Sequence, residues 1–196
     1  MKDTEVIQKF KDTGALLEGH FLLSSGLHSA VYLQCAIALQ NTKDAVEFGA
    51  AMAAHFNQDS IDTVASPAIG GLVIGYEVAR QLGVRFIWTE RQNGPMTLRR
   101  GFTVKEGERI LVVEDVITTG GSTRDTIDAL RSAGAEVIAA ASIIDRSGGH
   151  ADVGVPRFSL ATLSVPALTR EECAACQRGD VAIKPGSRSL TSGAQR

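Results

Sequence analysis

The sequence predicts a single α/β domain built around a mainly parallel sheet. Short apolar runs alternate with segments of helical periodicity through the centre of the chain, as expected of repeated strand and helix units. The continuous β-branched run at residues 110–113 is typical of a central strand that is buried on both faces. The chain has 196 residues, of which 44% are hydrophobic, and this is enough for one domain with a full core.

The central elements can be assigned in chain order. Strands are expected at residues 62–66, 84–88, 110–113 and 137–144, and helices at residues 72–82 and 123–132. Gly83 and Gly134 stand where these two helices should end. The polar, glycine-containing stretch at residues 89–102 predicts an excursion that acts as a mobile flap, not a helix.

Composition narrows the class of partner. The formal net charge is only -2, so we expect no binding of nucleic acid or of an acidic membrane surface, and a small-molecule ligand is favoured. No apolar run approaches the length that spans a bilayer, and the N-terminal segment is amphipathic and charged, unlike a signal peptide. These features predict a cytoplasmic protein.

The cysteines do not indicate a disulfide framework, because there are three of them. Cys173 and Cys176 form a C-x-x-C pair, but no second such pair completes a four-sulfur zinc site. The histidines are scattered along the sequence, at His20, His28, His55 and His150. We therefore expect no metal ion to be held by protein side chains alone.

Ligands of a parallel sheet bind beyond the carboxyl ends of its strands. Four polar or glycine-rich loops follow the predicted strands and should converge on one crevice, namely residues 66–71, 90–91, 114–122 and 145–146.

The loop after the strand at residues 110–113 has two chemical halves. Thr118 to Ser122 are small residues at the start of a helix, where free backbone N–H groups favour a phosphate. Glu114 and Asp115 are strong acceptors for hydroxyl groups. A sugar phosphate satisfies both halves. The loop has neither the Gly-Lys-Ser/Thr of a P-loop nor the G-x-G-x-x-G of a dinucleotide fold, which disfavours a nucleoside triphosphate or NAD.

The segment VVEDVITTGGST at residues 112–123 resembles the phosphoribosyl-diphosphate signature of the type I phosphoribosyltransferases. Further segments resemble the orotate phosphoribosyltransferases of that family, at residues 19–34, 66–83, 90–102, 143–149 and 184–188. The resemblance extends over most of the chain.

This resemblance implies the type I phosphoribosyltransferase fold, with a core at about residues 41–164 and a small hood formed by about residues 1–40 and 165–196. It implies that orotate and phosphoribosyl diphosphate give orotidine 5'-phosphate and pyrophosphate, with Mg²⁺, in de novo pyrimidine biosynthesis. It also implies a homodimer with shared active sites.

The same resemblance assigns roles to residues. Glu114 and Asp115 would bind the ribose hydroxyls, and Arg91 would reach from the flap to the diphosphate in the neighbouring subunit. These three are the expected catalytic residues. The expected phosphoribosyl-diphosphate site is Arg91, Glu114, Asp115, Val116, Ile117, Thr118, Thr119, Gly120, Gly121 and Ser122, and the expected orotate site is Thr118 and Arg146.

The chain departs from many relatives in its basic residues. Ser24 stands where those relatives have a lysine, and the flap segment QNGPMT has none. Arg99 and Arg100 could replace the missing charge, or they could be the outward and inward residues of a strand. Two other functions stay open at this stage. One is a regulator that senses phosphoribosyl diphosphate, and the other is a transferase that acts on another base, such as xanthine.

Overall fold

The computed structural model describes residues 1–23 and 26–185. The chain divides into two compact units, one formed by Met1–Ala15 with Gln34–Ser164 and the other by Leu16–Leu33 with Val165–Arg196. This division differs from the expected hood, because residues 1–15 and 34–40 belong to the larger unit. Their helices pack there, α1 (Asp3–Asp12) against strand β8 (Arg157–Thr162) and helix α2 (Cys35–Leu39), and α2 against α3 (Thr42–Ala53).

The larger unit is a mixed sheet between two layers of helices. Its strands lie in the order β5-β4-β3-β6-β7-β8, and only β5 is antiparallel to its neighbour. The strands are β3 (Thr63–Pro67), β4 (Arg85–Arg91), β5 (Met96–Leu98), β6 (Arg109–Ile117), β7 (Glu136–Asp145) and β8 (Arg157–Thr162). The helices are α1 (Asp3–Asp12), α2 (Cys35–Leu39), α3 (Thr42–Ala53), α4 (Leu72–Leu82) and α5 (Gly121–Ser132), with a short 3-10 turn, η1 (Gln58–Ser60).

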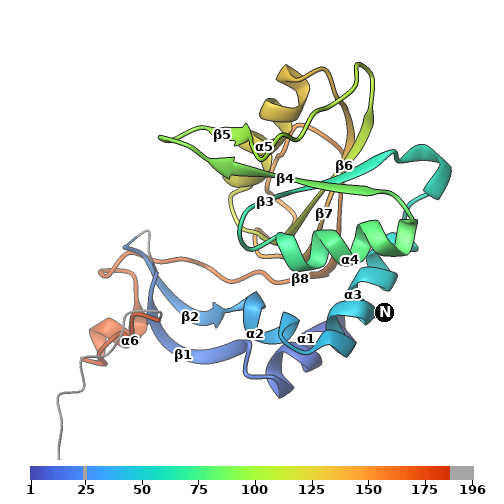
Figure 1. Cartoon of the computed structure of the whole chain (residues 1–196). Coiled ribbons are helices and arrows are strands. Elements are labelled where there is room, and N and C mark those ends of the chain that lie inside the picture. The colour runs from blue at the N-terminus through green and yellow to red at the C-terminus, as the bar shows by residue number, and fades with distance from the viewer. Residues whose placement is uncertain (24–25, 186–196) are drawn as a thin grey trace, which may run out of the picture. The chain divides into compact units, whose positions relative to one another are not determined.

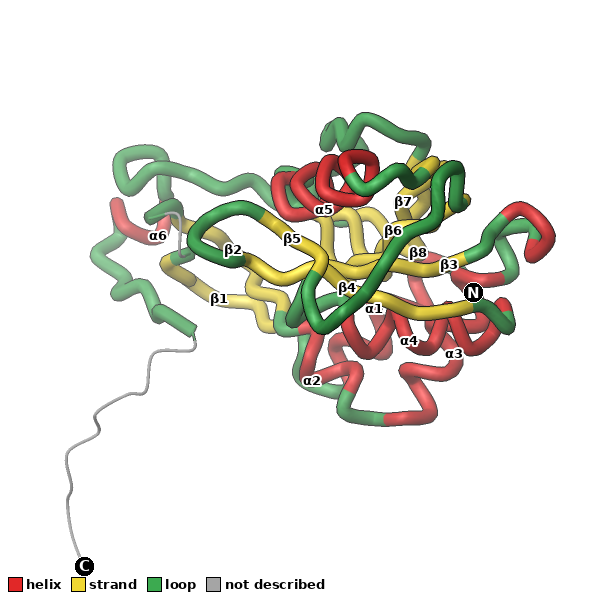
Figure 2. Tube along the Cα trace, turned by 45° about the horizontal axis from the view of Figure 1, so that its top comes forward, coloured by secondary structure: helices red, strands yellow, loops and turns green. Residues whose placement is uncertain are grey.

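Helices cover both faces of this sheet. Figures 1 and 2 show α3 and α4 on one face and α5 on the other. Strand β6 lies near the middle, and Ile110 to Val113 are fully buried, as predicted for a strand packed on both faces. The connection through α4 leads outward to β4, whereas the connection through α5 leads the other way to β7. The direction in which successive strands are added to the sheet therefore reverses between β3 and β6. Ligands of such sheets bind at this switch point.

The predicted central elements are all present. Helix α4 has the predicted bounds and ends at Gly83, whose φ of 68° is the left-handed conformation that glycine favours. Strand β6 runs four residues past its predicted end, because its ladder with β7 continues to the pair Ile117 and Asp145. The acids Glu114 and Asp115 therefore lie within the strand.

The flap is not helical, as expected, and its base is a hairpin. Strand β5 pairs with the end of β4, with Met96 opposite Arg91. Arg99 and Arg100 follow the strand, and Arg100 has a φ of 61°. The interpretation of these two arginines as alternating strand residues is therefore wrong.

The smaller unit is built on an antiparallel ribbon. Strand β1 (Leu16–Leu22) pairs with β2 (His28–Leu33), and a short helix, α6 (Ala174–Gln177), belongs to the same unit. Among its described residues, the buried apolar side chains are Leu16, Phe21 and Cys173. The prediction that concerned Ser24, and residues 186–188 of the resembling segment at 184–188, fall outside the described residues.

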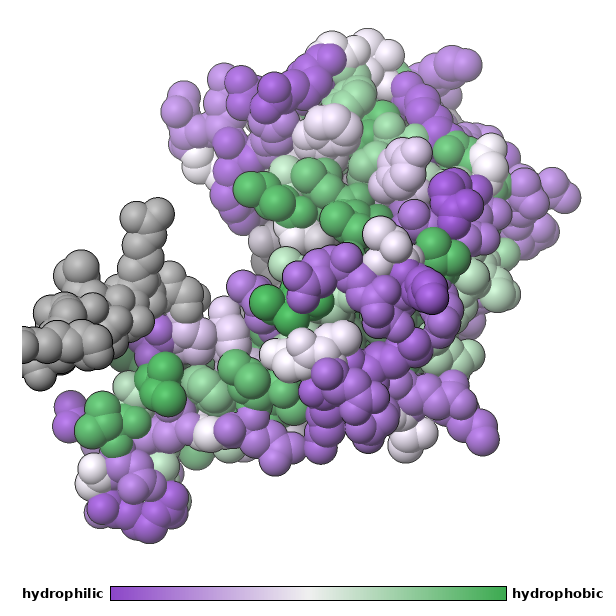
Figure 3. Space-filling view, turned by 60° about the horizontal axis from the view of Figure 1, so that its bottom comes forward, coloured by the Kyte–Doolittle hydropathy of each residue, from purple (hydrophilic) through white to green (hydrophobic). Residues whose placement is uncertain are grey.

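Within residues 1–23 and 26–185, no helix is long and apolar enough to cross a membrane. Figure 3 shows hydrophobic residues on one face in several separate groups, with hydrophilic residues between them.

Candidate active site

The β6–α5 loop forms a small polar cavity. It has a volume of about 150 Å³ and is lined by Glu114, Val116, Ile117, Thr118, Thr119, Gly120, Gly121, Ser122 and Thr123. Gly120 precedes the first residue of α5 and has a φ of 75°. A Cβ there would lie 2.8 Å from Val153 Cγ1, so the loop needs glycine for its conformation and for space. The free N–H groups of the first turn of α5 make this cavity suitable for an anion.

Two acids lie beside the cavity on β6, where Glu114 is buried and lines the cavity and Asp115 is half-buried. The residue Glu114 is 7% exposed, and burial together with the adjacent negative charge of Asp115 raises the pKa of Glu114 to about 9. Burial also raises the pKa of Asp115, although Asp115 Oδ1 accepts a hydrogen bond of 2.8 Å from the Val116 N–H. Ionising this pair is costly in the free protein. Ionisation becomes favourable when a ligand brings hydroxyl donors or positive charge.

The β3–α4 loop lies directly against these acids. A Cβ on Gly70 would be 2.8 Å from Asp115 Oδ1, and a Cβ on Gly71 would be 2.9 Å from the Val113 carbonyl oxygen. Side chains at these positions would displace the loop from the end of β6. The two glycines therefore allow the loops after β3 and β6 to approach each other at the switch point of the sheet.

Sequence reasoning missed Cys35, the first residue of α2. Cys35 is 2% exposed, and its thiol lies near the Asp115 carboxyl group. Burial and the negative charge of Asp115 raise the pKa of Cys35 well above its usual value, so it is a neutral thiol. No sequence motif marks this contact, because Cys35 and Asp115 are far apart along the chain.

The end of β7 brings Arg146 beside the loop. The Arg146 N–H donates to the Ile117 carbonyl oxygen at 2.7 Å, so Arg146 and Thr118 follow paired ends of adjacent strands. Burial lowers the pKa of Arg146, but a guanidinium keeps its charge at any physiological pH.

Asp145 is buried in an ion pair and hydrogen bonds that stabilise the local structure. It is 2% exposed and pairs with Arg157 at 2.6 Å, and it also accepts hydrogen bonds from Ser147 and Gly149. Although burial alone would raise the pKa of Asp145, hydrogen bonds from Ser147 and Arg157 lower it. This charged acid holds the turn that follows Arg146.

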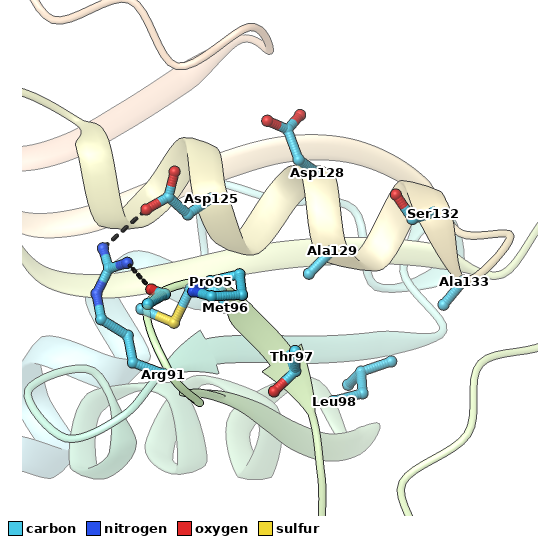
Figure 4. A pocket seen from close by; sticks show the side chains of 11 residues that line it. Arg91, Pro95, Met96, Thr97, Leu98, Asp125, Asp128, Ala129, Ser132 and Ala133 are labelled. Atoms are coloured by element: carbon cyan, nitrogen blue, oxygen red, sulfur yellow. Dashed lines mark hydrogen bonds and ion pairs between the residues drawn. The ribbon is translucent and has the colours of Figure 1, made fainter.

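The flap places Arg91 in a different cavity from the β6–α5 loop. Figure 4 shows that cavity, of about 590 Å³, between the β4–β5 hairpin and α5. The Arg91 guanidinium pairs with Asp125 at 2.7 Å and donates to the Gly94 carbonyl oxygen at 2.8 Å. Arg91 thus pairs with α5 of its own chain and does not line the cavity that holds Glu114.

The other two flap arginines share one partner. Arg99 and Arg100 both pair with Glu90, at 3.0 and 2.7 Å. Hydrogen bonds from Arg100 and from the Trp88 indole lower the pKa of Glu90 to about 2.

The fold and the loop define a class of protein. The family model "Phosphoribosyl transferase domain" matches residues 38–159, which include β3, β6, Glu114, Asp115 and the β6–α5 loop. The chain therefore belongs to the phosphoribosyltransferase family.

More specific relatives cover nearly the whole chain. An orotate phosphoribosyltransferase of Caldicellulosiruptor bescii is 53% identical over 96% of this chain and 99% of its own length. One of Thermotoga maritima is 48% identical over 95% of this chain and 98% of its own. The crystal structure of orotate phosphoribosyltransferase from Aeropyrum pernix has a TM-score of 0.68 at 28% identity, covering 81% of this chain and 93% of that one. Within the family, the chain is grouped with the orotate phosphoribosyltransferases.

Proposed function

We propose that this protein transfers the ribose 5-phosphate group of phosphoribosyl diphosphate to orotate, giving orotidine 5'-phosphate and pyrophosphate. The observation that carries the proposal is the pair Glu114 and Asp115 on β6, of which Glu114 is buried and lines a cavity suited to an anion at the switch point of the sheet. The near full-length similarity to orotate phosphoribosyltransferases supports the choice of base.

The cavity suits the two ends of a ribose 5-phosphate. Backbone N–H groups and hydroxyls from Thr118 to Ser122 bind the 5'-phosphate at the start of α5. Glu114 and Asp115 accept hydrogen bonds from the ribose hydroxyls, and these bonds strengthen as the acids become ionised. Cys35 and the Val116 N–H position the Asp115 carboxyl group.

Orotate carries a carboxylate and planar carbonyl oxygens, which a guanidinium can bind with two parallel hydrogen bonds. Arg146 supplies that group next to Thr118, at the paired ends of β6 and β7. Partial burial of Arg146 strengthens its interaction with an anion.

The acids also fit Mg²⁺. Carboxylate oxygens are the hard donors that this ion prefers, and the raised pKa of Glu114 indicates that the pair would gain from positive charge. Glu114 and Asp115 are the residues that would hold the ion. When bound with the diphosphate, Mg²⁺ stabilises the negative charge of the leaving group.

Breaking the bond between ribose and diphosphate makes the ribose positive and the leaving group negative, so catalysis requires electrostatic stabilisation of both. The acid pair, Glu114 and Asp115, stabilises the positive charge on the ribose. We assign Arg91 to the diphosphate in the site of a second copy of the chain, since its side chain lines a different cavity from the one that holds Glu114. The functional unit would then be a homodimer.

The direct test is to incubate purified protein with phosphoribosyl diphosphate and Mg²⁺, offering orotate, uracil, xanthine and adenine separately, and to measure pyrophosphate release. Release with orotate alone is the expected result. Release with another base would show a different acceptor. Binding of phosphoribosyl diphosphate without release for any base would instead indicate a sensor protein.

A further inference from the structure

Four side chains with metal-binding atoms converge in the smaller unit. They are His20, His28, Cys173 and Cys176, and their ligand atoms all lie within 4.8 Å of one another. This corrects the expectation that the histidines are scattered, because two of the four meet beside the C-x-x-C pair. The residues come from segments about 150 positions apart, so the sequence does not show the cluster.

Backbone hydrogen bonds hold the segment that carries the cysteines beside the strands that carry the histidines. The His28 N–H and carbonyl group exchange hydrogen bonds with Leu168, at 2.7 and 2.9 Å. The Ile183 N–H donates to the His20 carbonyl oxygen at 2.8 Å. The segment that carries both cysteines is therefore fastened to β2 before them and to β1 after them.

A β-bulge directs the first histidine. Between the pairs Glu18 with Val31 and Phe21 with Ser29, β1 has two residues where β2 has one, and His20 is one of those two. Bulges reorient side chains next to functional sites. Here the His20 and His28 rings lie 5.0 Å apart, and His20 Nε2 is 2.7 Å from His28 Nδ1.

The distances match a tetrahedral site. His20 Nε2 is 3.4 Å from the Cys173 sulfur and 3.5 Å from the Cys176 sulfur, and His28 Nδ1 is 3.4 Å from the Cys176 sulfur. Tetrahedral zinc with its usual bond lengths separates sulfur and nitrogen ligands by about 3.6 Å and two nitrogen ligands by about 3.3 Å. Zinc binding would separate the two ring nitrogens by about 0.6 Å and bring the remaining ligand atoms, all within 4.8 Å of one another, to similar spacings.

The surroundings also suit a metal. Cys173 and His28 are buried, and both cysteines are free of disulfides. His20 Nδ1 is buried with no hydrogen-bond partner among the described residues. The other ring nitrogen, Nε2, is the atom that faces the cluster.

We propose that His20, His28, Cys173 and Cys176 form a structural zinc site that fastens the cysteine-bearing segment to the β1–β2 ribbon. Two sulfur and two nitrogen ligands in a tetrahedron select zinc, and four protein ligands leave no open position for catalysis. The smaller unit needs such a link, because Leu16, Phe21 and Cys173 are its buried apolar residues within the described chain. Units with small cores are commonly stabilised by metals.

The first experiment measures zinc in the full-length protein after purification without chelators. We expect about one zinc ion per chain. Cys176→Ser and His28→Ala should each bind zinc at least about 100-fold more weakly. Cys35→Ser and His150→Ala, which alter a cysteine and a histidine outside the cluster, should keep the zinc content of the wild type.

A second measurement on the wild type avoids dependence on variants that could fail to fold. Cobalt(II) added to metal-free protein should give the intense ligand-field bands of tetrahedral geometry and a thiolate-to-cobalt charge-transfer band, and zinc should abolish both. A wild type that neither contains zinc nor binds cobalt with this spectrum would overturn the proposal. So would a Cys173–Cys176 disulfide in the freshly purified protein, or equal zinc loss in the control variants.

Discussion

The Arg91 guanidinium lies 2.7 Å from the Asp125 carboxylate on α5. If Arg91 serves the diphosphate of a second chain, this pair must break before catalysis, so Asp125 competes with the substrate for Arg91. Asp125→Asn should therefore lower the KM for phosphoribosyl diphosphate. Exposed ion pairs contribute about 0.2–1 kcal/mol, which corresponds to a change of roughly 1.4- to 5-fold.

The matched control is Asp128→Asn. Asp128 lies on the same helix and lines the same cavity, but the pair drawn to Arg91 is that of Asp125 (Figure 4). Steady-state kinetics with varied phosphoribosyl diphosphate should show an unchanged KM for this variant. Equal decreases in both variants would point to the general loss of negative charge on α5 and not to release of Arg91.

The sequence predicted most of the central fold because local signals agreed with tertiary structure. Residues 72–82 have helical periodicity and end in Gly83, and residues 110–113 form an apolar run that only a doubly covered strand explains. The signature at residues 112–123 gave the candidate site because its residues are contiguous.

The features that the sequence did not reveal depend on distant contacts. Cys35 reaches Asp115, and His20 reaches Cys173, only through the fold. The C-x-x-C pair was visible, but its partners lie on a bulged ribbon and have no fixed spacing from it. The hairpin register that turns Arg91 toward α5 likewise could not be predicted from the local sequence pattern.

A second prediction concerns the acid pair. Asp115→Asn should keep the fold, because the amide has the same shape and can still accept from the Val116 N–H. It should lose about 10- to 100-fold in kcat/KM, since hydrogen bonds to charged groups contribute about 1.5–3 kcal/mol. Circular dichroism and pyrophosphate release would measure the two effects. Wild-type turnover in a folded variant would remove Asp115 from the site.

A third prediction separates the two substrates. Arg146→Ala should raise the KM for orotate far more than the KM for phosphoribosyl diphosphate, because orotate carries the carboxylate that a guanidinium binds in a fork. The loss should be about 10-fold or more for a charge-assisted pair. Uracil lacks that carboxylate and serves as the comparison in a competition assay. Equal weakening of both substrates would argue against an orotate contact.

The pair of Asp145 with Arg157 gives a prediction for stability against pH. The folded-state pKa of Asp145 is lowered. This interaction therefore stabilises the protein above the unfolded pKa of about 3.9, and the contribution is lost as pH falls through the folded value. Arg157→Met leaves a buried acid without its charged partner, which typically costs about 3–5 kcal/mol.

Denaturant unfolding of Arg157→Met at several pH values should show a deficit that is largest above about pH 4 and shrinks under more acid conditions. Arg109→Met is the control, because its pair with Asp62 is exposed and should contribute much less. A deficit that does not depend on pH would mean that Arg157 acts through packing and not through the charge of Asp145.

The last prediction tests whether each site requires two chains. Arg91 pairs with Asp125 on α5, whereas Asp115 lies near the end of β6 in the sheet of the same chain. Arg91→Ala and Asp115→Asn should each keep at most about a tenth of the wild-type activity as homodimers. A mixed dimer, however, has one site with both defects and one site that is intact. Equal mixing with random exchange makes about half of the dimers mixed, so activity should recover to about a quarter of the wild type in a two-fold symmetric dimer.

Exchange would be followed independently with differently tagged chains. If the tagged chains exchange while the mixture stays as inactive as its parents, Arg91 does not act across a subunit boundary.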